Sequence, residues 1–226
     1  MQWSCCLRDR TALINQLRGL LSEYGEVAPL TRQGLRHRIP DVLEDADNGL
    51  TFVMRRMVQR MLNQWLTLDE DIEALEQELQ GLVTQHPNSK RLQTIPGVGP
   101  IGTALILASV NDAKAFKNGR QFAAWVGLTP KQYASGDHAR MGAITKRGNG
   151  HLRKTLIHGA RTVLNWCERK DDPLSVWCQN LKKNLPPCKA IVALANKLAR
   201  IIWAVLAHNT TYQPMLAAGK QSANAT

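Results

Sequence analysis

The chain has 226 residues, of which 44% are hydrophobic and 21% charged, so it can bury a core and is not a wholly disordered chain. Lys and Arg number 29 against 18 Asp and Glu, giving a net charge of +11 at pH 7, and such an excess most often serves a polyanion such as nucleic acid. No uncharged apolar run approaches the roughly 18–20 residues of a membrane span, and MQWSCCLRDR is unlike a secretory signal. We expect a cytoplasmic protein with no membrane partner.

The positive charge is concentrated in the second half of the sequence. Residues 41–87 hold three basic and ten acidic side chains, a net charge of −7, whereas residues 88–160 hold eleven and two, a net charge of +9. A local excess of this kind predicts contacts with phosphate groups. The alternative interpretation is that the basic side chains only keep the surface soluble.

Cysteine and histidine residues show no metal-binding pattern. The five cysteines are an odd number without C-x-x-C spacing, which argues against a disulfide framework or a structural zinc site. His151 and His158 share a helix face, but no carboxylate or cysteine accompanies them. We expect reduced thiols, no metal site and no cofactor in this chain.

The first half of the chain predicts long helices. Leu7–Tyr24 has apolar residues at spacings of three and four, and Gly25 follows as a stop. Residues 25–49 are rich in proline and glycine and indicate a connecting segment, with a short helix near Asp41–Asp45.

Leu50–Leu82 predicts one long helix with a seam close to a heptad repeat and an acidic outer face over Asp69–Glu78. Because a lone helix of that length cannot bury its seam, it needs a partner, either the Leu7–Tyr24 helix or a second subunit of a homo-oligomer. The predicted seam consists of Met54, Met57, Met61, Trp65, Leu68, Ile72, Leu75, Leu79 and Leu82.

The second half also predicts helices, with only short extended pieces near Lys131–Ala134 and Ala143–Thr145. The fold class is therefore mostly α: a long coiled-coil-like helical linker and a small helical domain. We expect a linker over residues 1–87, the domain over 88–210 and a flexible tail over 211–226. The helices expected in the domain are Ile101–Val110, Gly119–Val126, Gly150–Trp166 and Lys189–Ala207.

The segment Ile95-Pro-Gly97-Val-Gly99-Pro-Ile101 joins two predicted helices. Its glycines allow a tight turn with unobstructed amides, and amides at a helix start suit a phosphate oxygen. The segment is similar to the helix-hairpin-helix motif, which grips a DNA backbone, so Gly97 and Gly99 are candidate nucleic-acid ligands. The alternative is a turn used only for helix packing.

A second segment, Gly127–Arg153, combines five glycines with five Lys or Arg residues before a helix near Gly150. Glycine permits close approach of a ligand and basic side chains neutralise phosphates. By itself the Ser135-Gly136 pair is ordinary turn chemistry. The candidate nucleic-acid-binding side chains here are Lys131, Arg140, Lys146, Arg147, Arg153 and Lys154.

The motifs GLTP, SG, ITKRGN and LRKTLIHGAR occur together and in order. This combination closely resembles the C-terminal domain of the insertion-sequence one-ten family of bacterial transposases. The stretch LRDRTALINQLRGLLSEYG also looks like the linking helix of that family, so the resemblance covers about Leu7 to Ala207.

The resemblance implies a specific chemistry. In that family a RuvC-like nuclease domain with four acidic metal ligands precedes the linker, the C-terminal domain supplies a nucleophilic serine, and a structured guide-type RNA bridges donor and target DNA. Ser135 matches the serine, and Arg140, Lys146, Arg147 and Arg153 match its basic surroundings.

The RuvC-like domain has no counterpart in this sequence, so Mg²⁺ is expected only together with that missing domain. We therefore expect a transposase part that binds DNA and recombines it through Ser135, but not autonomously. The alternative hypothesis is a non-catalytic helical module that binds DNA or RNA.

Overall fold

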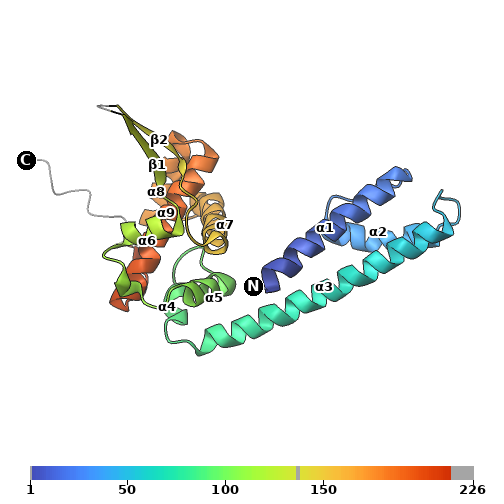
Figure 1. Cartoon of the computed structure of the whole chain (residues 1–226), viewed down its shortest axis with the longest axis horizontal. Coiled ribbons are helices and arrows are strands. Elements are labelled where there is room, and N and C mark those ends of the chain that lie inside the picture. The colour runs from blue at the N-terminus through green and yellow to red at the C-terminus, as the bar shows by residue number, and fades with distance from the viewer. Residues whose placement is uncertain (1, 136–137, 215–226) are drawn as a thin grey trace, which may run out of the picture. The chain divides into compact units, whose positions relative to one another are not determined.

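The structure, a computed structural model, describes residues 2–135 and 138–214 and is mostly α, as predicted (Figure 1). Most of the expected tail, residues 215–226, lies outside the described residues. The chain forms two compact units, Met1–Glu78 and Leu79–Thr226. The first unit contains α1 (Gln2–Glu23), α2 (Arg32–Glu44) and most of α3 (Phe52–Gln85). The second contains α4 (Ser89–Gln93), α5 (Pro100–Ser109), η1 (Ala113–Ala115), α6 (Gly119–Val126), β1 (Pro130–Ser135), β2 (His138–Ile144), α7 (Gly150–Trp166), η2 (Cys167–Arg169), α8 (Pro173–Asn184) and α9 (Pro187–His208).

The long helix of the first unit is confirmed. α3 has 34 residues, about 51 Å at 1.5 Å per residue. Within the described chain its apolar face is covered by α1 and α2, so the first unit buries its own core. That core includes Leu17 of α1, Leu35 of α2 and Trp65 of α3, each 0% exposed.

Two residues of the predicted seam are exposed to solvent. Met57 is 47% exposed and Leu82 is 61% exposed, whereas Val58 and Val83 next to them are buried. A strict heptad assumes 3.5 residues per turn, and a straight helix with 3.6 drifts away from that template. The buried face of α3 therefore leaves the predicted seam at these positions.

The segment after α1 was wrongly predicted as a connection with only a short helix. α2 runs from Arg32 to Glu44, capped by the Thr31 side chain, which accepts a bond from the Gly34 amide. Buried Leu35, Ile39 and Val42 lie at helical spacing along it, although Pro40 stands inside the helix. Tertiary burial of this face outweighs the cost of the proline.

The acidic face of α3 is partly turned toward the other helices, whereas the sequence predicted an outer face. The Asp69 carboxylate lies 2.8 Å from the guanidinium of Arg10, 3.9 Å from that of Arg32 and 3.8 Å from that of Arg36. Asp69 therefore ties α1 and α2 to α3 by charge.

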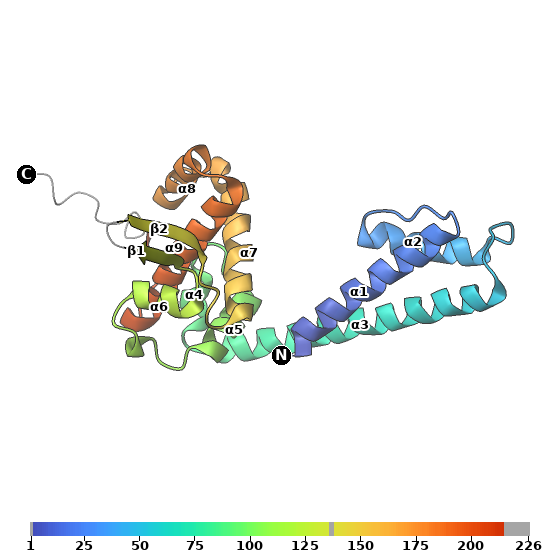
Figure 2. The same cartoon turned by 45° about the horizontal axis from the view of Figure 1, so that its top comes forward.

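The second unit is organised around α9, which packs against α6 and α7 (Figure 2). The indole N–H of Trp203 in α9 donates to the carbonyl oxygens of Ala113 (3.0 Å) and Phe116 (3.2 Å), and these bonds hold the segment before α6.

In the described part of the chain, α9 is the one helix long and apolar enough to cross a membrane by length and composition. Here it is the central helix of a packed domain, and 44% of its apolar window is buried.

Replacing Trp65 tests the core of the first unit. Trp65→Ala removes a fully buried side chain and should lower the free energy of unfolding by about 3–5 kcal/mol. The matched control Met57→Ala alters a 47% exposed position and should cost about 1 kcal/mol or less. Urea denaturation followed by circular dichroism measures both, and equal losses would contradict the assigned core face.

Candidate nucleic-acid interface

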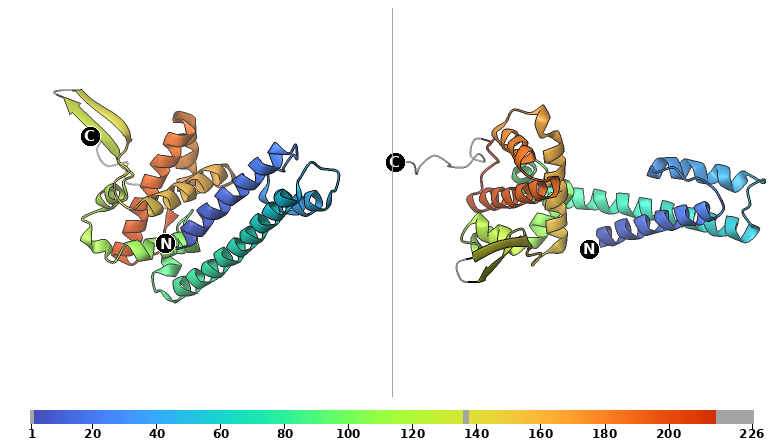
Figure 3. Two further views of the ribbon diagram at one scale, coloured as in Figure 1. Left: turned by 45° about the vertical axis from the view of Figure 1, so that its right-hand side comes forward. Right: turned by 90° about the horizontal axis from the view of Figure 1, so that it is seen from above.

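The part of the chain richest in glycine and basic residues forms an antiparallel β-hairpin, a two-stranded ribbon made of β1 and β2. The extended piece predicted at Lys131–Ala134 is confirmed within β1, but β2 begins at His138, earlier than the predicted Ala143. Tyr133 and Met141 are 60% and 64% exposed. The hairpin stands away from the helices of its unit (Figure 1; Figure 3, left).

Ser135 is the last residue of β1. The register pairs it with His138, and pairs Arg140 with Tyr133. Its neighbours Gly136 and Asp137 lie outside the described residues. The backbone of Ser135, the candidate nucleophile, therefore lies at the end of the hairpin that is remote from the helices.

Two glycines hold the base of the hairpin. Gly127 (φ +80°) ends α6, and a Cβ atom there would lie 2.8 Å from the Arg147 nitrogen. Gly148 (φ +90°) precedes α7, and a Cβ atom there would collide with the carbonyl oxygen of Trp125. The Lys146 amide also donates to the Gly127 carbonyl (3.2 Å). Both turns therefore require glycine, because no side chain fits between the two backbones.

The Arg153 side chain forms hydrogen bonds at the same junction. Its guanidinium donates to the carbonyl oxygens of Val126 (3.0 Å) and Arg147 (3.2 Å). Asn149 caps α7 by accepting from two amides of the first turn, and its own amide donates to Ser109 (3.1 Å). Arg153, predicted to bind phosphate, thus joins the end of α6 to the start of α7.

The other predicted cations near this junction face solvent. Lys131 precedes Tyr133 in β1, Lys146 and Arg147 lie in the turn after β2, and Lys154 lies in the first turns of α7; all four are exposed. Within the described residues their side chains make no hydrogen bond or ion pair. These four exposed cations are therefore grouped around the base of the hairpin and the start of α7.

The two glycines of the first motif differ in role. Gly97 (φ +80°) lies against α7, where a Cβ atom would be 2.7 Å from the Gly159 carbonyl oxygen and 2.9 Å from a methyl of Val163. Gly99 caps α5 and has open space beside it. Gly97 therefore serves packing, whereas Gly99 makes no close contact that requires glycine.

The two motifs do not form one compact site. Gly97 contacts α7 at Gly159. Gly159 lies nine residues after Gly150, the first residue of α7, which is about 13 Å along the helix axis. The basic turn and the IPGVG turn contact different parts of α7. Three further exposed residues of this helix, His151, His158 and Arg161, are not among the sequence-based candidates, although their spacing of seven and three residues places them on one helix face.

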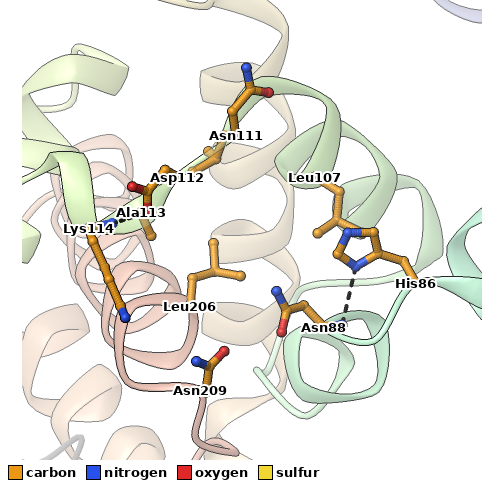
Figure 4. A pocket seen from close by; sticks show the side chains of 10 residues that line it. His86, Asn88, Leu107, Asn111, Asp112, Ala113, Lys114, Leu206 and Asn209 are labelled. Carbon is orange, nitrogen blue, oxygen red and sulfur yellow. Dashed lines mark hydrogen bonds between the residues drawn. The ribbon is translucent and has the colours of Figure 1, made fainter.

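A cavity of about 280 Å³ lies elsewhere in the second unit, between the α3–α4 turn, the end of α5 and the end of α9 (Figure 4). His86, Asp112 and Asn209 are among its lining residues, and the His86 ring accepts a bond from the Asn88 amide (3.2 Å). None of the predicted site residues lines it.

The described residues do not fit a metal ion: no group of three or more His, Cys, Asp or Glu side chains is placed to hold one. All five cysteines are free, as predicted. Burial raises the pKa of the Cys178 thiol to about 12, so this thiol remains protonated and unreactive at neutral pH.

Comparison with known proteins identifies the class of this domain. Residues 89–173, which include the IPGVG turn, the hairpin and α7, match the family described as Transposase IS116/IS110/IS902. Residues 89–173 therefore form a domain of that transposase family.

Its relatives extend the similarity over most of the chain. It is 41% identical to a probable family 20 transposase of Pseudomonas aeruginosa over 92% of this chain and 62% of the relative. It is 40% identical to the transposase for insertion sequence element IS1111A of Coxiella burnetii over 92% of this chain and 57% of that relative. It is 25% identical to the insertion element IS110 uncharacterized 43.6 kDa protein of Streptomyces coelicolor over 90% and 55%. The chain thus spans little more than half the length of these relatives.

The glycine roles lead to a direct test. Gly97→Ala places a methyl group against the Gly159 backbone at a positive φ and should lower the free energy of unfolding by about 1–3 kcal/mol. Gly99→Ala meets open space and should cost less than about 1 kcal/mol. Thermal and urea unfolding measure both variants, and an unaffected Gly97→Ala protein would disprove the packing contact.

Proposed function

We propose that this chain is the part of a DNA transposase that binds DNA and supplies the nucleophile, with Ser135 attacking a DNA phosphodiester. The observation that carries the proposal is the ribbon itself. Its base is locked by Gly127 and Gly148, its far end carries Ser135, and exposed cations surround the base. A nucleophile held at the end of a fixed, projecting hairpin can reach the backbone of a long polymer such as DNA, which cannot enter an enclosed pocket.

The proposed step is a transesterification. The Ser135 hydroxyl oxygen bonds to the phosphorus, the bond from phosphorus to the 3′ oxygen breaks, and a phosphoserine link and a free 3′ hydroxyl result. The hydroxyl proton lost by serine is balanced by the proton gained at the 3′ oxygen. Positive side chains such as Arg147 would stabilise the charge that develops on the phosphoryl oxygens.

Serine needs activation before it can attack. Because the described residues do not fit a metal site, we propose that activation depends on the RuvC-like domain expected from the family resemblance, with its Mg²⁺. Element-end DNA, target DNA and a structured RNA are the proposed partners, in the cytoplasm. A homo-oligomer through the first unit is also proposed, supported by the exposed apolar residues Phe52, Val53 and Met57 at the start of α3.

Ser135→Ala tests the nucleophile. With element-end DNA, RNA, Mg²⁺ and a separately supplied RuvC-like domain, the native chain should form a covalent protein–DNA adduct, and the variant should form none while binding DNA equally well. Ser22→Ala, at an exposed serine of α1, is the matched control and should retain the adduct. Denaturing gel electrophoresis and mass spectrometry of the linked peptide detect it.

An adduct on the Ser135→Ala protein would place the nucleophile elsewhere. Binding without an adduct under every condition would make the chain a non-catalytic DNA- or RNA-binding module, the alternative function.

Charge removal tests the binding surface. The triple change of Lys131, Lys146 and Arg147 to Gln should weaken duplex DNA binding and reduce the slope of log affinity against log salt by about 2.7, or about 0.9 per lost phosphate contact. Gln at Lys170, Lys183 and Lys189, which are exposed and lie outside the hairpin and α7, is the control of equal charge. Fluorescence anisotropy between low and high salt measures the slopes. Equal slopes for the two triple variants would contradict this surface.

A further inference from the structure

One face of α7 carries a line of cationic and ionisable side chains. His151, Lys154, His158 and Arg161 follow steps of three, four and three residues and are all exposed. The opposite face carries the buried residues Leu152, Leu156, Ala160 and Leu164, which pack into the core of the second unit. Helical periodicity therefore separates a core face from a continuous solvent-facing row.

This row has no local counter-charge. α7 contains no Asp or Glu, and within the described residues the side chains of the row make no hydrogen bond or ion pair. The eleven residues from His151 to Arg161 span about 15 Å of helix axis. A row of that length can contact several successive phosphates of a nucleic-acid strand.

An exposed aromatic ring stands at the end of the same helix. Trp166, the last residue of α7, is 51% exposed, and the Arg169 guanidinium lies 4.2 Å from its ring centroid. Trp166 follows His158 by eight residues, which places it about 12 Å further along the helix axis and about 80° around the helix from His158. An exposed ring beside cations is the arrangement on which unpaired bases stack.

We propose that this face of α7 binds an unpaired segment of nucleic acid, with phosphates along the row from His151 to Arg161 and a base stacked on Trp166. The inference rests on the proposed function and deepens it by naming the form of nucleic acid at this face. A single strand fits better than a duplex because only unpaired bases present a free ring surface. A lipid surface fits poorly because the row has no apolar residues between its cations.

The test compares binding of a fluorescein-labelled 12-nucleotide single strand and a 12-base-pair duplex by anisotropy, using the full chain. The double change Lys154→Gln and Arg161→Gln should weaken single-strand binding and reduce its salt slope by about 1.4, or about 0.7 per contact. Lys183→Gln with Lys189→Gln removes equal charge from exposed positions off α7 and should leave that slope unchanged.

Stacking has its own readout. Trp166→Ala should weaken single-strand binding about 5- to 100-fold with a much smaller effect on the duplex, and Trp166→Phe should restore most of the affinity. Circular dichroism confirms that each variant is folded. The inference is overturned if Trp166→Ala binds the single strand like the native chain. It is also overturned if the α7 double variant and the control double variant show the same reduction in salt slope. In either case, native binding to the duplex would leave the proposed function standing. A native chain that binds neither probe would overturn the proposed function itself.

Discussion

The close approach of two backbones at Gly127 and Gly148 is the constraint on which the second unit depends. A two-stranded ribbon is only marginally stable by itself, and here its two ends are fixed because the turn after α6 and the turn before α7 lie within van der Waals contact of each other. Main-chain bonds between Thr145 and Thr129 (2.9 Å) and between Lys146 and Gly127 (3.2 Å) continue the strand pairing into this junction. The ribbon therefore projects from a rigid base.

The same junction also orients α7. Asn149 caps this helix one residue after Gly148, and Arg153 in its first turn donates back to the carbonyl oxygen of Val126, the last residue of α6. The exposed row of α7 is thus fixed relative to the base of the ribbon that carries Ser135. Part of the KRGN motif is consequently structural, because Gly148 and Asn149 shape the junction and leave Lys146 and Arg147 as the exposed cations.

The two units of the chain carry net charges of opposite sign. The first unit, residues 1–78, holds nine basic and thirteen acidic side chains, a net charge of −4, whereas residues 79–226 hold twenty and five, a net charge of +15. In the first unit the Asp69 carboxylate lies within 3.9 Å of three arginine side chains, so the charge of this carboxylate is paired within its own unit. In the second unit the exposed lysines and arginines of the ribbon base and α7 remain available to a polyanion.

The long helices, the basic second half and the transposase motifs could all be predicted from the sequence, because helix periodicity, net charge and motif order are local properties. The burial of α2 despite Pro40, and the departure of α3 from its heptad seam at Met57 and Leu82, could not, because these depend on which helices cover each face. The pairing of β1 with β2 and the contact of Gly97 with Gly159 were equally hidden, since each joins residues that only the folded chain brings together. The sequence by itself determined the helical class, the family and the candidate Ser135. Only the tertiary structure decided which glycines serve packing, which cations stay exposed and where the ribbon stands, because non-local burial and close backbone contact set those outcomes.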